Sequence, residues 1–183
     1  TLRMRASKPS LWPCVATSAR VELRILSRQV APYVFMLLAA LLVLEVGQGQ
    51  RGPFDSASRL TSGALATASI PILTVVGCVL LLVCLVEALD RARQRRLHEL
   101  LHSSVAHSAA LLLGPAMASA GALVAMLAVS MLAALAMIAA QGKAPLTVAP
   151  FLWTWGVVLA PGFLLFAAFV IAVYTRTRQR ALA

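Results

Sequence analysis

Charged residues are scarce in this sequence. Asp, Glu, Lys and Arg together make up 12% of its 183 residues, whereas soluble domains carry about a quarter. Hydrophobic residues make up 61%, and the mean hydropathy is +0.88. The lack of charge argues against a water-soluble enzyme, and the apolar excess is typical of a membrane protein.

Acidic residues are the scarcest charges, with 6 Asp and Glu against 16 Lys and Arg, and none follows Glu99. In a soluble protein the net charge of +10 would suggest nucleic-acid binding, but in a membrane protein it indicates topology, so we expect no nucleic-acid partner. The chain lacks a G-x-x-x-x-G-K-[ST] loop, which argues against ATP binding by this chain. Its 3 cysteines form no C-x-x-C pair, and we predict no disulfide and no redox site.

Long apolar runs are abundant. A helix that crosses the hydrocarbon core needs about 20 mostly apolar residues. Prolines inside two of the runs are compatible with this, because neighbouring helices re-satisfy the backbone. We predict a loose leader at residues 1–18 and an all-α integral membrane domain at 19–183, with spans at 31–47, 63–86, 116–140 and 149–174.

Basic residues are unevenly distributed between the connections of these spans. The whole segment before the first span, the connection between the second and third spans, and the C-terminal tail hold all but three of them. Arg51, Arg59 and Lys143 lie in the other two connections. Because Lys and Arg accumulate on the cytoplasmic side, we predict a multi-pass protein of the cell (inner) membrane with both termini in the cytoplasm, N-in/C-in.

Two patterns inside the spans predict how the helices are placed, one through packing between helices and the other through contact with the membrane interface. Gly121 and Ala125 lie four residues apart in the third span, a spacing that lets helices approach closely. Near the outer end of the fourth span, Phe151, Trp153 and Trp155 predict an aromatic belt at the membrane interface.

The middle connection contains a match to the H-E-x-x-H pattern of zinc proteases, formed by His98, Glu99 and His102. On a helix the two histidines share a face, and the glutamate could activate a metal-bound water. A catalytic zinc also needs a third protein ligand, but no acidic residue follows, and the arginines at 91–96 disfavour a dication. We predict no metal site and keep the metallopeptidase as an alternative.

The same region resembles the permease subunits of ABC-2 type transporters. In that family a span is followed by a charged stretch, an E-L-L triplet, a small polar turn and an l-l-x-G sequence that opens the next span. The corresponding segments here are residues 91–96, 99–101, 103–105 and 111–114. Pro115 stands where the family usually has Lys or Arg. The resemblance extends over residues 19–174.

The resemblance implies that a separate ATPase chain binds the cytoplasmic face, so that this chain is not itself an enzyme and carries no cofactor. A helix at 89–104 would be the coupling helix, and an amphipathic interfacial helix at 19–30 would be a second contact. The residues implied for the ATPase contact are Arg91, Arg95, Arg96, Glu99, Leu100 and Leu101. Those implied for the interfacial helix are Arg20, Glu22, Arg24 and Arg28.

Members of the family usually have six spans, so we expect a C-terminal truncation or a degenerate member. A second permease subunit, identical or different, would pair with this one to enclose a path through the lipid bilayer. Besides the metallopeptidase, the alternative is a four-span membrane protein without a transport role, whose basic run only holds one end near anionic lipid.

Overall fold

The computed structural model describes residues 11–49, 61–94, 108–141 and 145–180, and every regular element within these ranges is helical. In this part of the chain, four stretches are long and apolar enough to cross a membrane. They are Val30–Gly49, Ile70–Arg91, Leu113–Gln141 and Ala149–Thr177. The protein is therefore an all-α, multi-pass membrane protein, as its composition predicts.

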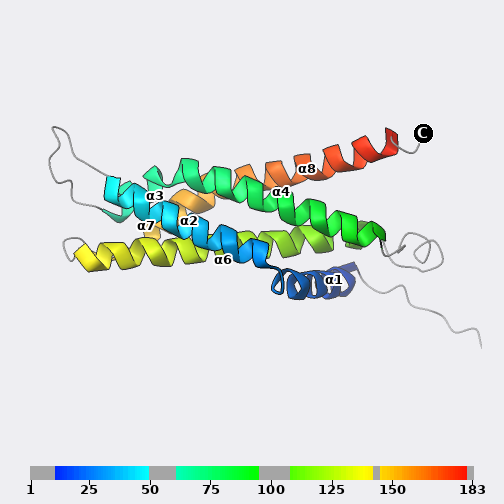
Figure 1. Cartoon of the computed structure of the whole chain (residues 1–183), viewed down its shortest axis with the longest axis horizontal. Helices are drawn as coiled ribbons and strands as arrows, with labels where there is room; N and C mark the ends of the chain where they lie inside the picture. Colours follow the sequence, from blue (N-terminus) through cyan, green and yellow to red (C-terminus); the bar gives the residue numbers. More distant parts are fainter. Residues whose placement is uncertain (1–10, 50–60, 95–107, 142–144, 181–183) are drawn as a thin grey trace, which may run out of the picture.

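The spanning helices run side by side along one long axis (Figure 1). In chain order the helices are α1 (Leu11–Leu26), α2 (Val30–Gly49), α3 (Ser62–Ala68), α4 (Ile70–Gln94), α6 (Ser108–Gln141), α7 (Ala149–Thr154), the π-helical segment η2 (Trp155–Leu159) and α8 (Ala160–Arg180). The ends of α4 and α8 and the start of α6 lie at the same end of the bundle as α1 (Figure 1). We call this the α1 end.

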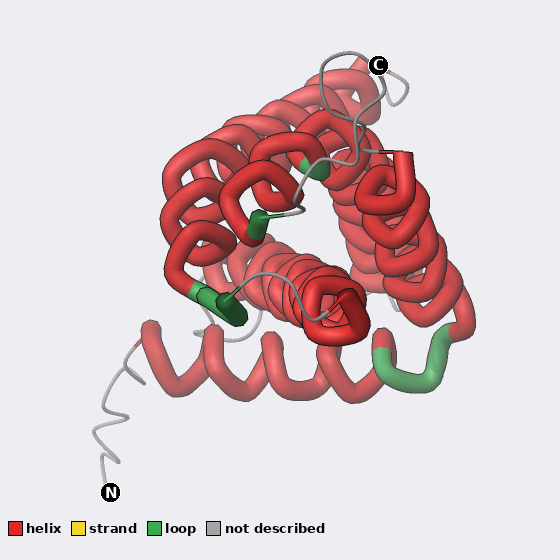
Figure 2. The backbone as a smooth tube through the Cα atoms, turned by 90° about the vertical axis from the view of Figure 1, so that its left-hand side faces the viewer, coloured by secondary structure: helices red, strands yellow, loops and turns green. Residues whose placement is uncertain are grey.

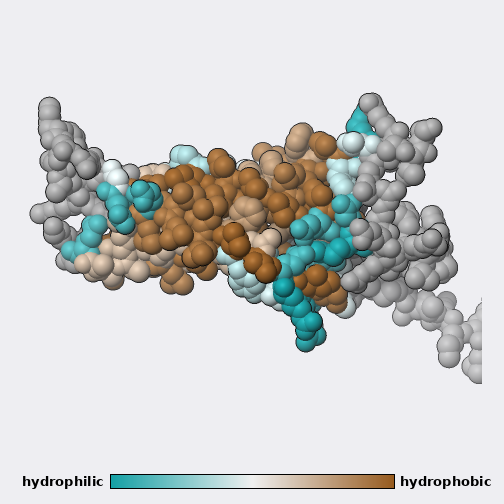
Figure 3. All heavy atoms as spheres, viewed as in Figure 1, coloured by the Kyte–Doolittle hydropathy of each residue, from teal (hydrophilic) through white to brown (hydrophobic). Residues whose placement is uncertain are grey.

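The surface of the bundle is apolar along its middle, with hydrophilic side chains toward the two ends (Figure 3). On α8, for example, Leu164 and Leu165 are 71% and 73% exposed. Water would not tolerate so large an exposed apolar surface, whereas lipid tails solvate it well. The exposed face of the bundle therefore matches a bilayer.

The first helix lies crosswise to the spans, which is clearest when the bundle is viewed end-on (Figure 2). It begins at Leu11, so the predicted loose leader is wrong for residues 11–18, which form the first half of α1. Pro13 is compatible with this start, because the first turn of a helix has backbone N–H groups without intrahelical partners. The helix ends at Leu26, earlier than predicted, and a turn at 27–29 leads into α2.

The second predicted span is interrupted near its N-terminal end. A turn at Ser69 separates α3 from α4, and Pro71 is the second residue of α4, where its missing N–H breaks no bond within that helix. The carbonyl of Ala66 accepts hydrogen bonds from the Ser69 hydroxyl at 3.0 Å and the Trp155 indole at 3.1 Å. Neighbouring side chains thus satisfy the backbone at the interruption.

The fourth span contains a π-helical turn just before Pro161. Proline cannot donate to the carbonyl four residues earlier, and its ring crowds that carbonyl. The wider turn of η2 relieves this conflict, and the backbone N–H of Ala160 donates to the carbonyl of Trp155 instead. The span thereby continues from α7 into α8.

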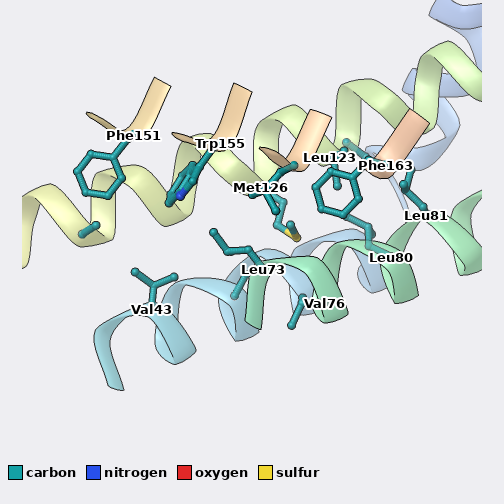
Figure 4. Close-up of a cluster of buried hydrophobic side chains, with 14 of the residues drawn as sticks. Val43, Leu73, Val76, Leu80, Leu81, Leu123, Met126, Phe151, Trp155 and Phe163 are labelled. Carbon is teal, nitrogen blue, oxygen red and sulfur yellow. The ribbon is translucent and has the colours of Figure 1, made fainter. Parts of the chain in front are cut away.

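The predicted aromatic belt is wrong for two of its three members. Phe151 is fully buried and Trp155 is 5% exposed, with their rings in an edge-to-face contact, whereas Trp153 is 74% exposed. Residues four apart share a helix face and the residue between them points away, so only Trp153 can face lipid. Figure 4 shows Phe151 and Trp155 beside the other core side chains.

Glycines allow the helices of the bundle to approach closely. A Cβ atom at Gly77 of α4 would lie 2.5 Å from the ring of Phe163 on α8, and one at Gly47 of α2 would lie 2.5 Å from the sulfur of Met137 on α6. In a bilayer, where helix association depends on packing rather than on the hydrophobic effect, such contacts stabilise the bundle.

The closest approach joins α1 to α6. A Cβ atom at Gly114 would collide with the hydroxyl of Ser18 and lie 2.7 Å from its Cβ. Further along α6, Gly121 faces Leu23. The glycine that opens the third span therefore lets the crosswise helix dock.

We predict that Gly114→Ala destabilises the protein, because the added methyl group must push α1 away from α6. The matched control is Gly162→Ala on α8, where a Cβ meets no atom within 4 Å. The control should be neutral or stabilising, since alanine is favoured over glycine in a helix by about 0.5–1 kcal/mol. Thermal unfolding of the purified protein in detergent measures both, and equal midpoints for the two variants would contradict the close approach.

Candidate functional site

Polar side chains gather at the α1 end of the bundle. They come from α1, the turn that follows it, α4 and α8, and hydrogen bonds or ion pairs connect them. The members are Glu22, Gln29, Glu87, Asp90, Arg91 and Tyr174. We call this group the polar junction.

Arg91 is the centre of the polar junction. One of its terminal nitrogens lies 3.5 Å from Glu22 on α1, and the other lies 3.4 Å from Glu87, one turn earlier on α4. The side chains of Arg91 and Glu22 are 21% and 16% exposed. The distances are long for hydrogen bonds, so the attraction is mainly between the charges.

Because this ion pair is partly buried, removal of one partner costs more free energy than it would in an ion pair on the surface. A charge removed from water costs free energy unless an opposite charge compensates it, and the loss of one partner costs more than the pair contributes. The Nε of Arg91 is also buried and has no hydrogen-bond partner in the described part of the chain. Arg91 therefore depends on Glu22 and Glu87 for compensation, and it holds α1 against α4.

Two further hydrogen bonds attach neighbouring elements to the same stretch of α4. The side-chain amide of Gln29 donates to Glu87 at 2.8 Å, which fixes the turn between α1 and α2. The hydroxyl of Tyr174 donates to Asp90 at 2.7 Å, which attaches α8. A displacement of the end of α4 would therefore pull on α1, α2 and α8 through these contacts.

The site residues predicted from the sequence fall into two groups. Glu22 and Arg91 meet in the polar junction, whereas Arg20, Arg24 and Arg28 are exposed to the surroundings. Of the predicted coupling helix, residues 89–94 continue α4 without interruption. Outside the described residues lie Arg95, Arg96, Glu99, Leu100 and Leu101, together with His98 and His102.

Sequence reasoning missed the partners that make the junction. The spacing of Glu87 and Arg91, four residues apart on one helix, indicates a local ion pair. No local signal indicates that Glu22, Gln29 and Tyr174 come together from distant parts of the chain.

The polar junction attaches α1, the turn that follows it and α8 to one stretch of α4. Within the described ranges, no three His, Cys, Asp or Glu side chains lie close enough together to hold a metal ion. Cys84 is buried in the apolar core and Cys78 packs against that core, so both behave as small apolar side chains, and neither forms a disulfide.

No protein-family model, curated protein or solved structure matches the chain.

We predict that Glu22 and Arg91 are energetically coupled. Glu22→Gln and Arg91→Met should each lower the free energy of unfolding by about 1–3 kcal/mol, less than for a fully buried pair because both side chains retain some exposure. The double variant should lose less than the sum of the two, by about 0.5–1.5 kcal/mol.

The measurement is a double-mutant cycle on chemical unfolding in detergent. Arg24→Met in place of Arg91→Met provides the control cycle. Arg24 is exposed and lies on the opposite side of α1 from Glu22, so it should show no coupling with Glu22. Additive losses in the Glu22–Arg91 cycle would contradict the ion pair.

Proposed function

We propose that this chain is the membrane-spanning permease subunit of an ATP-driven exporter of the ABC-2 type. It would lie in the inner membrane of a bacterium with the α1 end in the cytoplasm, and a separate chain would bind and hydrolyse ATP. The sequence resemblance over residues 19–174 and the position of the basic connections support this proposal.

The observation that carries the proposal is the ion pair between Glu22 and Arg91. It joins the crosswise helix α1 to the end of the span that leads directly into residues 95–104, the stretch with the E-L-L triplet. In the proposed mechanism these two segments are the ATPase contacts. A connection between them would let both respond to one movement of the ATPase.

The packing of α4 supplies a route from that movement to the bilayer. Away from the α1 end, α4 packs against α6 and α8, and Gly77 lets the ring of Phe163 approach the backbone of α4. A push on the α1 end would therefore tilt or shift α4 against two neighbouring spans. Pairing with a second permease subunit would convert this shift into opening and closing of a path between the subunits.

Arg91 takes a different part in this mechanism from the one that the resemblance implies. Its guanidinium group is held by Glu22 and Glu87 and is largely buried. We therefore assign direct contact with the ATPase to Arg95, Arg96, Glu99, Leu100 and Leu101. Arg91 instead keeps α1 attached to the moving segment.

We predict that a P-loop ATPase co-purifies with the chain from gently solubilised membranes of its native host. Glu99→Arg combined with Leu101→Asp should lower its recovery about tenfold or more, because a charge reversal and a buried charge each cost an interface more than about 1 kcal/mol. Quantitative mass spectrometry of the purified complexes measures the recovery.

The matched control is Gln141→Arg with Leu146→Asp, two exposed residues near the opposite end of the bundle, which should leave the recovery unchanged. Absence of an ATPase from the parent sample, or equal losses in both variants, would contradict the proposal. If no ATPase is found, zinc that is bound by the parent and lost in His98→Ala would favour the metallopeptidase. If neither an ATPase nor zinc is found, a four-span protein without a transport role would be favoured.

A further inference from the structure

The outward face of α1 is basic. Arg20 and Arg24 lie one helical turn apart on this face, and Arg28 lies in the turn that follows the helix. All three side chains are exposed, and none forms an ion pair with a carboxylate of the described residues. Within the part of the chain that the structure describes, the three guanidinium groups are therefore available to a ligand outside the bundle.

No negative charge on α1 opposes these arginines. Glu22 is the only acidic residue between positions 11 and 30, and it faces the bundle, where it pairs with Arg91. The ion pair of the polar junction thus has a second consequence, because it removes the carboxylate from the outward face. That face attracts anions.

The position of α1 places this face at the depth of lipid headgroups. The helix lies crosswise to the spans (Figure 2), so it lies along the plane of the membrane. Three residues separate Leu26 from the start of α2, and such a segment reaches about 10 Å. The hydroxyl of Tyr33, in the first turn of α2, donates to the carbonyl of Ser27 at 2.8 Å, and tyrosine favours the membrane–water interface.

Apolar side chains flank the basic face. Val21 and Leu23 lie on either side of the arginines around the helix and are both exposed. An in-plane helix with arginines on one face and apolar residues beside them is the arrangement that binds the boundary between headgroups and acyl chains. Leu23 packs partly on α6 at Gly121, and the rest of its surface, like that of Val21, is exposed.

We propose that Arg20, Arg24 and Arg28 form a binding site for anionic phospholipids of the leaflet in which α1 lies. The planar guanidinium groups would donate paired hydrogen bonds to the phosphate oxygens, and the acyl chains would pack on Val21 and Leu23. Zwitterionic lipids bind more weakly there, because their own cation cancels the attraction. The site exists whether or not an ATPase binds the chain.

Native mass spectrometry of the purified full chain tests the site with two probes, dioleoyl phosphatidylglycerol and dioleoyl phosphatidylcholine. The parent should bind phosphatidylglycerol preferentially. The triple variant Arg20→Gln, Arg24→Gln, Arg28→Gln should lose about tenfold or more of this preference, since each basic residue near an anionic surface contributes about 1 kcal/mol.

Two control variants separate a lipid site from general effects of charge and folding. Arg176→Gln, Arg178→Gln, Arg180→Gln removes three arginines from α8 near the same end of the bundle and should retain the preference. Replacement of the three α1 arginines by lysine keeps the charges but not the paired hydrogen bonds, so it should retain the part of the preference that depends on charge alone.

Three outcomes would overturn the proposal. The parent could lack a preference for phosphatidylglycerol, or the α8 variant could lose as much of it as the α1 variant. The α1 variant could also keep the lipid preference and lose a co-purifying ATPase, and the arginines would then be a protein contact instead.

Discussion

The arrangement of the α1 end depends on one partly buried cation, Arg91. A guanidinium group near the edge of a bilayer needs opposite charge close by, and the adjacent turn of α4 supplies only Glu87 and Asp90. Asp90 is engaged by Tyr174 on α8, and Glu87 also accepts a hydrogen bond from Gln29. Glu22 completes the compensation, but it does so from another helix. The ion pair with Arg91 thereby helps to fix the rotation of α1 on α6, and that rotation determines which face of α1 is exposed.

The longest helix, α6, provides the surface on which this arrangement is built. It packs against α1, α2 and α4, and small residues along it allow the other helices to come close. Gly114 and Gly121 face α1, while the fully buried Met126 fills the centre of the core. Close packing holds the helices in place along the apolar part of the bundle. The ion pair and hydrogen bonds at the α1 end add polar attachments between α1, the turn that follows it, α4 and α8.

The sequence predicts the spans well because the thickness of the hydrocarbon core imposes a length on each apolar run, and this constraint is local. The interruption at Ser69 and the π-helical turn before Pro161 are also local features, each close to a proline. A proline is compatible with several backbone conformations, and packing against the neighbouring helices selects one of them. The spacing of the three aromatic residues places Phe151 and Trp155 on one helix face and Trp153 on the other. It does not indicate which of the two faces packs into the core, and the structure shows that Phe151 and Trp155 do. The partnership of Glu22 with Arg91 has no local signal, because it joins residues 69 positions apart. The predicted ATPase contacts at 95–101 lie outside the described residues and stay predictions.

The central claim is that α1 docks crosswise on α6 at its glycine. Oxidative cross-linking in native membranes tests it most directly, with Ser18→Cys and Gly114→Cys introduced into a chain whose own cysteines are replaced by alanine. A Cβ at Gly114 would lie 2.7 Å from that of Ser18, whereas a disulfide holds the two at about 3.8 Å. An outward shift of α1 by about 1 Å, which the added side chain itself imposes, brings the pair to disulfide distance, so cross-linking within the chain is expected. Ser18→Cys paired with Gly162→Cys should not cross-link. Failure of the first pair to cross-link, or equal cross-linking of both pairs, would contradict the account.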